Sequence, residues 1–118
     1  MGNKFHKVYV VTVPANSTAL VNIIDSVALS GKITQLNIDI PDGWNYNTGI
    51  QIRIGRHVFP VEDTADGQNT FTGNDTDLQL RPDIDVKEEK VSIWGINNDT
   101  VYDHSCVVTL EIDPEFSK

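Results

Sequence analysis

The chain has 118 residues, the size of one ordinary domain, and can bury most of its apolar surface in a single core. Its formal net charge is -8 at pH 7 and its sequence pI is about 4.6. Because a strongly negative surface repels phosphate groups and anionic headgroups, we expect neither nucleic acid nor a membrane among its partners. The single cysteine, Cys106, cannot form an intrachain disulfide, so the fold must rest on packing.

The N-terminal residues are polar and lack the apolar segment of a secretory signal. No apolar run reaches the ~20 residues that a membrane-spanning helix needs. We therefore expect the protein to be made in the cytoplasm.

Alternation of apolar and polar residues dominates the chain and predicts β-strands. Residues 8–13 and 19–24 are apolar on both faces, which favours strands at the centre of a sheet or strands covered by another subunit. Residues 36–40 and 50–54 place their leucine and isoleucine side chains on one face. The longest alternating segment is 106–112, with the cysteine on its apolar face and its polar face toward water.

Turn-forming Gly, Pro and Asn residues separate these segments, so the pattern predicts about eight short strands in a sandwich or small barrel. The densely charged residues 83–89 are the one place where a short helical turn is expected. Residues 61–77 form the longest connector, which is too long for a simple hairpin turn. We expect a single β-sandwich domain over residues 8–113, with an N-terminal arm (1–7) and a C-terminal tail (114–118).

The long connector contains four aspartates whose oxygen atoms are ligands of the kind that Ca²⁺ prefers: Asp63, Asp66, Asp75 and Asp77. Their spacing does not fit the twelve-residue calcium loop, because no Glu closes it at the required position. The sequence therefore predicts a solvated acidic loop and no bound metal, with these aspartates as the weak calcium candidates.

Residue types that could support catalysis do not combine into a site. Cys106 lies on the apolar face of its strand, where burial raises the pKa of a thiol and lowers its reactivity. Ser105 and His104 are neighbours on a strand, so their side chains point to opposite faces and cannot pair as nucleophile and base. The three histidines, His6, His57 and His104, lack the spacing of a zinc site. We predict a protein that is not an enzyme and has no cofactor; a small sandwich hydrolase or a metal-dependent cupin-like enzyme is the remote alternative.

Aromatic residues lie near the predicted turns and loops: Trp44, Tyr46, Phe59, Phe71, Trp94 and Tyr102. Exposed aromatic side chains at loops stack on sugars or anchor protein interfaces. Trp44 and Tyr46, which follow a Pro-Asp-Gly turn, are the best candidates for exposure. Phe59 and Trp94 are expected instead to close the ends of the core.

Five segments, taken together, resemble small virion proteins of tailed phages and related archaeal viruses. In chain order they read VTVPANST, GKITQLNIDIPDGW, GIQIRIGRHVFP, FTGNDTDLQL and IWGINNDTVYDHSCVVTLEI. The resemblance spans nearly the whole chain and implies an antiparallel sandwich of jelly-roll type that assembles as a symmetric oligomer on the virus particle. It brings no catalytic residues. Residues 44–48 are more polar than the family pattern, and residues 66–69 replace a more apolar loop.

The expected function is that of a non-enzymatic virion protein, a capsid decoration (cement) protein that forms a homotrimer and binds the major capsid protein. Its residues expected at subunit or capsid contacts are Phe5, Trp44, Tyr46, Phe71 and Tyr102. The alternative is a glycan- or receptor-binding module of a spike or tail, with loop aromatics stacked on a host surface glycan and the acidic loop holding Ca²⁺.

Overall fold

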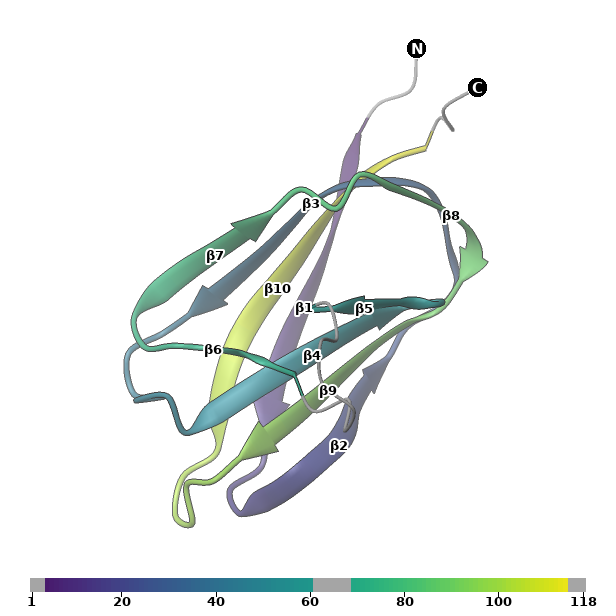
Figure 1. Cartoon of the computed structure of the whole chain (residues 1–118). Coiled ribbons are helices and arrows are strands. Elements are labelled where there is room, and N and C mark those ends of the chain that lie inside the picture. Colours follow the sequence, from purple (N-terminus) through teal and green to yellow (C-terminus); the bar gives the residue numbers. More distant parts are fainter. Residues whose placement is uncertain (1–3, 61–68, 115–118) are drawn as a thin grey trace.

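Two antiparallel sheets pack face to face in the computed structural model, which describes residues 4–60 and 69–114 (Figure 1). Sheet A consists of β1 (Phe5–Val13), β3 (Leu29–Ile40), β7 (Thr76–Leu80), β8 (Ile84–Glu89) and β10 (His104–Asp113). Sheet B consists of β2 (Ser17–Asp25), β4 (Thr48–Ile54), β5 (His57–Phe59), β6 (Phe71–Thr72) and β9 (Val91–Asn97). The predicted all-β sandwich is confirmed.

The chain passes back and forth between the sheets, and its last strands insert between its first ones. In sheet A, β10 lies between β1 and β3; in sheet B, β9 lies between β2 and β4. This is the double Greek-key arrangement of a jelly roll. The described strands number ten, whereas about eight were predicted, because β7 and β8 pair with different parts of β3, and β5 and β6 pair with different parts of β4. The ten described strands therefore occupy the eight strand positions of a jelly roll, four in each sheet.

The core forms where the alternating segments of the two sheets face each other. In β10 the predicted apolar face is buried throughout: Cys106, Val108, Leu110 and Ile112 are each 2% exposed or less. The apolar residues of β3 and β4, predicted from the same alternation, are also buried. Gly95 of β9 permits a close contact between the sheets, because a Cβ atom there would lie 2.6 Å from Cγ2 of Val13.

The two segments that are apolar on both faces do not lie at the centre of a sheet. β1 and β2 are edge strands, and β1 pairs with β10 alone among the described strands. The prediction of central strands is wrong for both segments, because the composition of a strand does not determine its neighbours. Val8 and Val10 instead remain 61% and 68% exposed. The other predicted explanation, a covering subunit, stays a prediction.

Strands also replace two segments that were predicted otherwise. Residues 83–89 contain β8 and no helical turn, because Ile84 and Val86 alternate with charged residues and turn inward against β3. The predicted connector 61–77 contains β6 and the first residues of β7 in its described part. β1 begins at Phe5, inside the predicted arm.

Trp44 is completely buried, so the expectation that it is exposed and available for a subunit contact is wrong. Its indole Nε1 donates a hydrogen bond to the carbonyl oxygen of Ser105 at 3.0 Å. The loop that carries it is held by Asn74, whose Oδ1 accepts hydrogen bonds from the backbone N–H groups of Gly43 (2.8 Å) and Asn45 (3.0 Å). Trp44 thus closes the core between β3 and β4, the role predicted for other aromatics.

Of those other aromatics, one is buried and one is not. Phe59 is 8% exposed and belongs to the core, as predicted. Trp94 lies on the outer face of sheet B, in the middle of β9, where the guanidinium carbon of Arg53 lies 4.3 Å from the centre of its ring. Trp94 therefore does not close an end of the sandwich.

We expect Trp44→Ala to lower the free energy of unfolding by about 3–5 kcal/mol, because it removes a fully buried aromatic side chain and leaves a cavity. Urea denaturation followed by far-UV circular dichroism measures this loss. Tyr46→Ala, two residues away at a side chain that is 73% exposed, is the matched control and should cost far less. Equal losses in the two variants would contradict the core role of Trp44.

Candidate functional site

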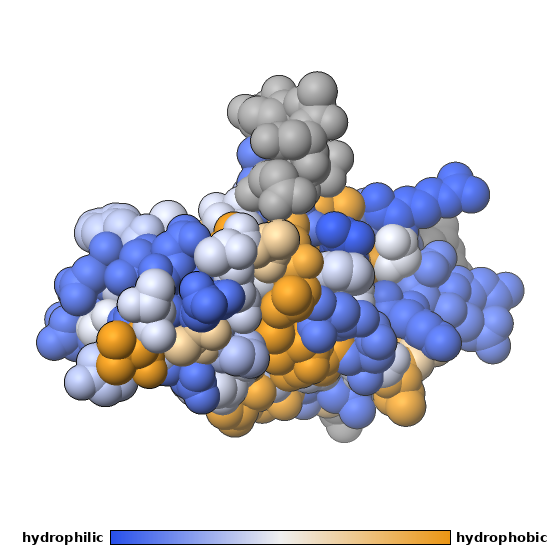
Figure 2. Space-filling view, turned by 90° about the horizontal axis from the view of Figure 1, so that it is seen from below, coloured by the Kyte–Doolittle hydropathy of each residue, from blue (hydrophilic) through white to orange (hydrophobic). Residues whose placement is uncertain are grey.

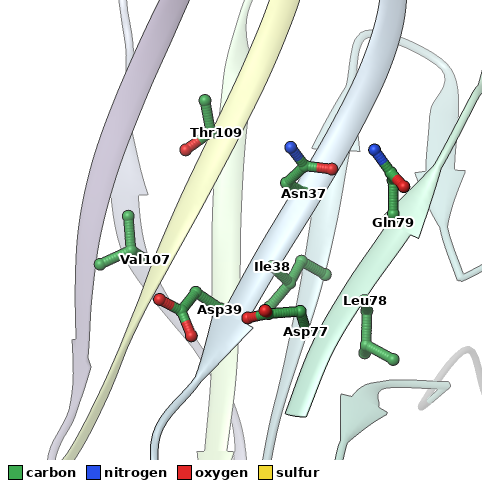
Figure 3. A pocket seen from close by; sticks show the side chains of 8 residues that line it. All are labelled: Asn37, Ile38, Asp39, Asp77, Leu78, Gln79, Val107 and Thr109. Atoms are coloured by element: carbon green, nitrogen blue, oxygen red, sulfur yellow. The ribbon is translucent and has the colours of Figure 1, made fainter.

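A polar hollow of about 440 Å³ lies on the outer face of sheet A, over β10, β3 and β7 (Figure 3). Strand register places six outward side chains in two rows across these strands. One row holds Val107, Asp39 and Asp77, and the other holds Thr109, Asn37 and Gln79. The hollow has the volume of an ordinary small-ligand site, and polar groups from three strands line it.

Asp39 and Asp77 face each other across adjacent strands, and Figure 3 shows their carboxyl groups side by side. A hydrogen bond to Asp77, partial burial and the negative charges of Asp77 and Asp75 raise the pKa of Asp39 above its ordinary value. Like charges directly opposite one another in a sheet are destabilising. The structure therefore holds a pair of acceptor groups here at a cost to its own stability.

The amide and hydroxyl groups of the second row are open to a ligand. Asn37 accepts a hydrogen bond at its Oδ1 from Nε2 of Gln35 at 3.1 Å, and its amide N–H groups have no hydrogen-bond partner within the described residues. The side chains of Gln79 and Thr109 have no hydrogen-bond partner within the described residues. Donors and acceptors thus converge on one hollow.

A smaller and mostly apolar hollow of about 150 Å³ adjoins the polar one. The two share Asp39 and Val107, and the smaller one extends over Val10 and Pro41. The thiol of Cys106 lies beneath it and is 2% exposed. Burial, with a smaller contribution from the charge of Asp39, raises the pKa of Cys106 to about 12. The predicted rise in the thiol pKa is confirmed.

The aromatic residues predicted to make contacts do not form one cluster with this hollow. Tyr46 and Tyr102 are 73% and 67% exposed and belong to two end loops, which the backbone hydrogen bond from Asn98 N to Asn47 O joins at 2.8 Å. Phe5, 39% exposed, begins β1. Phe71 packs partly buried against the core. Their roles in contacts with other chains stay predictions.

The four calcium candidates divide in the structure. Asp63 and Asp66 lie outside the described residues. Asp77 lies on β7 beside Asp39, and Asp75 occupies the turn before β7 with a φ of 48°. In the described part of the chain, no three His, Cys, Asp or Glu side chains are placed to hold a metal ion together.

Each histidine has a different neighbour. His104 Nε2 lies 2.8 Å from Oδ2 of Asp99, whose Oδ1 accepts backbone hydrogen bonds from Val101 and Tyr102. These backbone bonds and His104 lower the pKa of Asp99. His57 stacks on Phe59 and His6 lies 3.4 Å from Glu111. The pair of His104 and Asp99 therefore holds the end of the loop between β9 and β10.

No protein-family model and no curated protein matches the chain. None of the described residues forms a helix long and apolar enough to cross a membrane.

Sequence reasoning missed the hollow because its two acidic residues belong to strands far apart in the chain. The alternation of residues 36–40 does show that Asn37 and Asp39 point away from the core. What the sequence does not show is that Asp77 is on a strand, or that this strand pairs with β3.

We expect Asp39→Asn to raise the melting temperature at pH 7, because it removes a carboxylate that faces Asp77 and Asp75. The pKa of Asp39 is raised by folding, so its contribution to stability is present below its unfolded pKa and is lost as pH rises through the raised value. The advantage of the variant should therefore shrink as pH falls toward about 4. Thermal melts across this range measure it, and Asp85→Asn on β8 is the control of equal charge change. A gain that is independent of pH, or equal in the control, would refute this account.

We expect Cys106 to resist alkylation by iodoacetamide at pH 8 in the folded protein, because its thiol is buried and stays protonated at that pH. The same thiol should react within minutes in 8 M urea. Intact-mass spectrometry counts the adduct. Fast labelling of the folded protein would show that the region beneath the apolar hollow opens readily.

Proposed function

We propose that the protein is a non-enzymatic virion structural protein, a capsid decoration protein that forms a homotrimer and binds the major capsid protein. The proposal takes its identity from the resemblance of the sequence to small virion proteins. The jelly-roll sandwich agrees with it. The single observation that supports assembly is an exposed strip of valines along the edge of sheet A.

The valine strip consists of Val8 and Val10 on β1 and Val107 on β10, all on the outer face. Val10 lies opposite Val107 in the strand register, and Val8 is two residues from Val10 on the same face. Val8 and Val10 are more than half exposed. Scattered single apolar residues are normal on a surface, but neighbouring ones on one face mark a contact region.

The edge of the sheet adds backbone groups to the strip. β1 has β10 on one side and no strand on the other within the described chain. An uncovered edge strand offers N–H and C=O groups to another chain, and natural proteins usually protect such edges. A second subunit that covers β1 would bury the valines and pair these groups at once.

Charge favours another copy of this chain as the occupant. The segment from Lys4 to Val13 contains Lys4, His6 and Lys7 and no acidic residue, although the whole chain has a net charge of -8. Lys4 and His6 each lie 3.4 Å from Glu111 of the same chain, so Lys7 is the basic residue of β1 left to meet an acidic surface of the next copy. In a trimer each contact joins two different surfaces. Complementary charge then fixes the orientation of the contact.

The space-filling view shows where apolar surface gathers on one side of the molecule. Seen from below, apolar residues form a central band between two mostly hydrophilic sides (Figure 2). A band of this kind is typical of a surface that contacts protein. On a capsid lattice, many such modest contacts add up to strong retention because the subunits of an oligomer bind together.

The alternative function, a module that binds a glycan by stacking loop aromatics on it, loses its main residue in the structure. Trp44 was the first residue of the aromatic platform, and its side chain is entirely within the core. Tyr46 and Tyr102 remain exposed, but neither side chain lines the polar or the apolar hollow of sheet A.

Sedimentation velocity tests the proposal. We expect the wild-type protein to sediment with three times the chain mass of 13.1 kDa, and Val10→Lys to sediment as a monomer with an unchanged circular dichroism spectrum. Val27→Lys is the matched control, since Val27 is 71% exposed and lies outside β1. It should leave the trimer intact.

The second experiment measures binding to capsids that lack this chain. Wild-type protein should co-sediment with them, and Val10→Lys should bind them much more weakly because it loses the multiple attachment of the trimer. A wild-type monomer at about 1 mM that also fails to bind capsids contradicts the proposal. A trimeric Val10→Lys variant refutes the role of the valine strip.

A further inference from the structure

We propose that the polar hollow on sheet A, together with the apolar hollow beside it, is a binding site for a neutral saccharide. The site is formed by Asp39, Asp77, Asn37, Gln79 and Thr109, with Val107 between the two hollows. It does not depend on the proposed capsid function, and it uses none of the residues predicted to bind a glycan by aromatic stacking.

The chemistry of the open groups matches a ligand rich in hydroxyl groups. When both are ionised, the carboxylates of Asp39 and Asp77 only accept hydrogen bonds, and a sugar hydroxyl donates one. When Asp39 is protonated, its O–H can donate to Asp77 instead. The amide groups of Asn37 and Gln79 donate to hydroxyl oxygens. Because each hydroxyl both donates and accepts, a saccharide can satisfy both rows of the hollow.

The placement of these groups suits adjacent hydroxyls of one ring. Residues opposite each other on neighbouring strands have Cβ atoms about 4.5–5.5 Å apart. Asn37 and Gln79 are such a pair, and so are Asp39 and Asp77. Figure 3 shows the two amide groups in one row and the two carboxyl groups in the next, on the same side of the sheet.

The apolar hollow adds an apolar surface beside the polar hollow. Val107 separates the two, and Val10 and Pro41 line the smaller one. Saccharides carry C–H groups as well as hydroxyls, so an apolar surface beside a polar one can hold both kinds of group. A purely polar ligand would leave this surface uncovered.

Charge selects among ligands with hydroxyl groups. Asp39, Asp77 and the nearby Asp75 make the hollow negative, and the whole chain has a net charge of -8. Sialylated, sulfated or phosphorylated sugars would be repelled. Among common saccharides the charge therefore excludes the acidic ones and leaves the neutral ones.

A metal ion is a poorer occupant of the same place. Ca²⁺ takes six to eight oxygen ligands, usually with several carboxylates. The described residues place only Asp39 and Asp77 in the hollow, and no third carboxylate completes a group there.

The test is an amide-resolved NMR titration of ¹⁵N-labelled protein with neutral hexasaccharides of glucose, mannose, galactose and N-acetylglucosamine, after a glycan array has selected further neutral probes. We expect at least one to shift amide signals of β3, β7 and β10 with a Kd below about 1 mM. Asp77→Asn and Gln79→Ala should each weaken binding about tenfold, because a hydrogen bond to the sugar is lost. Asp85→Asn, on the same sheet outside the hollow, should leave Kd within about twofold.

The altered side chains are exposed, so the variants should still fold, although Asp77→Asn should raise the melting temperature as Asp39→Asn does. Their melting curves check this. A blank array with flat titrations to about 10 mM would overturn the proposal, as would binding that survives the double variant Asp77→Asn, Gln79→Ala. Signal shifts with CaCl₂ but with no sugar would also overturn it and identify a cation site instead.

Discussion

The register of β10 is the constraint on which the rest of the structure depends. β10 pairs with β1 on one side and β3 on the other, so it joins the two ends of the chain within one sheet. A shift by one residue would expose the face that runs from Cys106 to Ile112 and bury Val107 and Thr109. The present register instead sends a continuous apolar face to the core. It also fixes what the outer face carries, because Val107 and Thr109 must then point outward, one into the valine strip and both into the hollow.

The outer face of sheet A is therefore set by the same alternation that forms the core. Its outward residues are polar over β3 and β7, whereas the middle of β1 carries the apolar side chains of Val8 and Val10, which produces two regions of different character on one surface. The polar region keeps two aspartates in direct opposition, at a cost that a sheet with no other role would avoid by placing a neutral residue at either position. Packing of the core accounts for the inward residues of these strands, but it gives no reason for two opposed carboxylates, Asp39 and Asp77, on the outer face.

The sequence predicts the parts of this structure that depend on neighbouring residues. The strands over residues 36–40, 50–54 and 106–112 follow from alternation alone, and so does the burial of their apolar side chains. Position within a sheet depends on which strands meet, and for that reason two apolar faces could not decide between a central strand and one covered by another subunit; β1 and β2 lie at edges. Trp44 was misjudged for a related reason: a Gly- and Asn-rich turn indicates exposure of its backbone, but the side chain reaches back to Ser105, a residue on the last strand. The opposition of Asp39 and Asp77 needed the pairing of β3 with β7, which no local pattern shows.

The two regions of sheet A overlap at Val107, and only the polar rows lie clear of the valine strip. β1 is the edge strand and β7 is the strand at the other end of the hydrogen-bonded order, with β10 and β3 between them. A subunit that covers the valine strip would also cover Val10 and Val107, which line the apolar hollow, and would leave the polar rows over β3 and β7 open to solvent. Three copies around a threefold axis would then present three identical hollows. Binding of a single neutral sugar through a few hydrogen bonds is weak, but copies held at fixed spacing on a particle bind a surface with many sugars far more strongly than one copy does. Association through β1 would thus determine how many polar hollows act together, while the neighbouring subunit would cover the apolar hollow at Val10 and Val107.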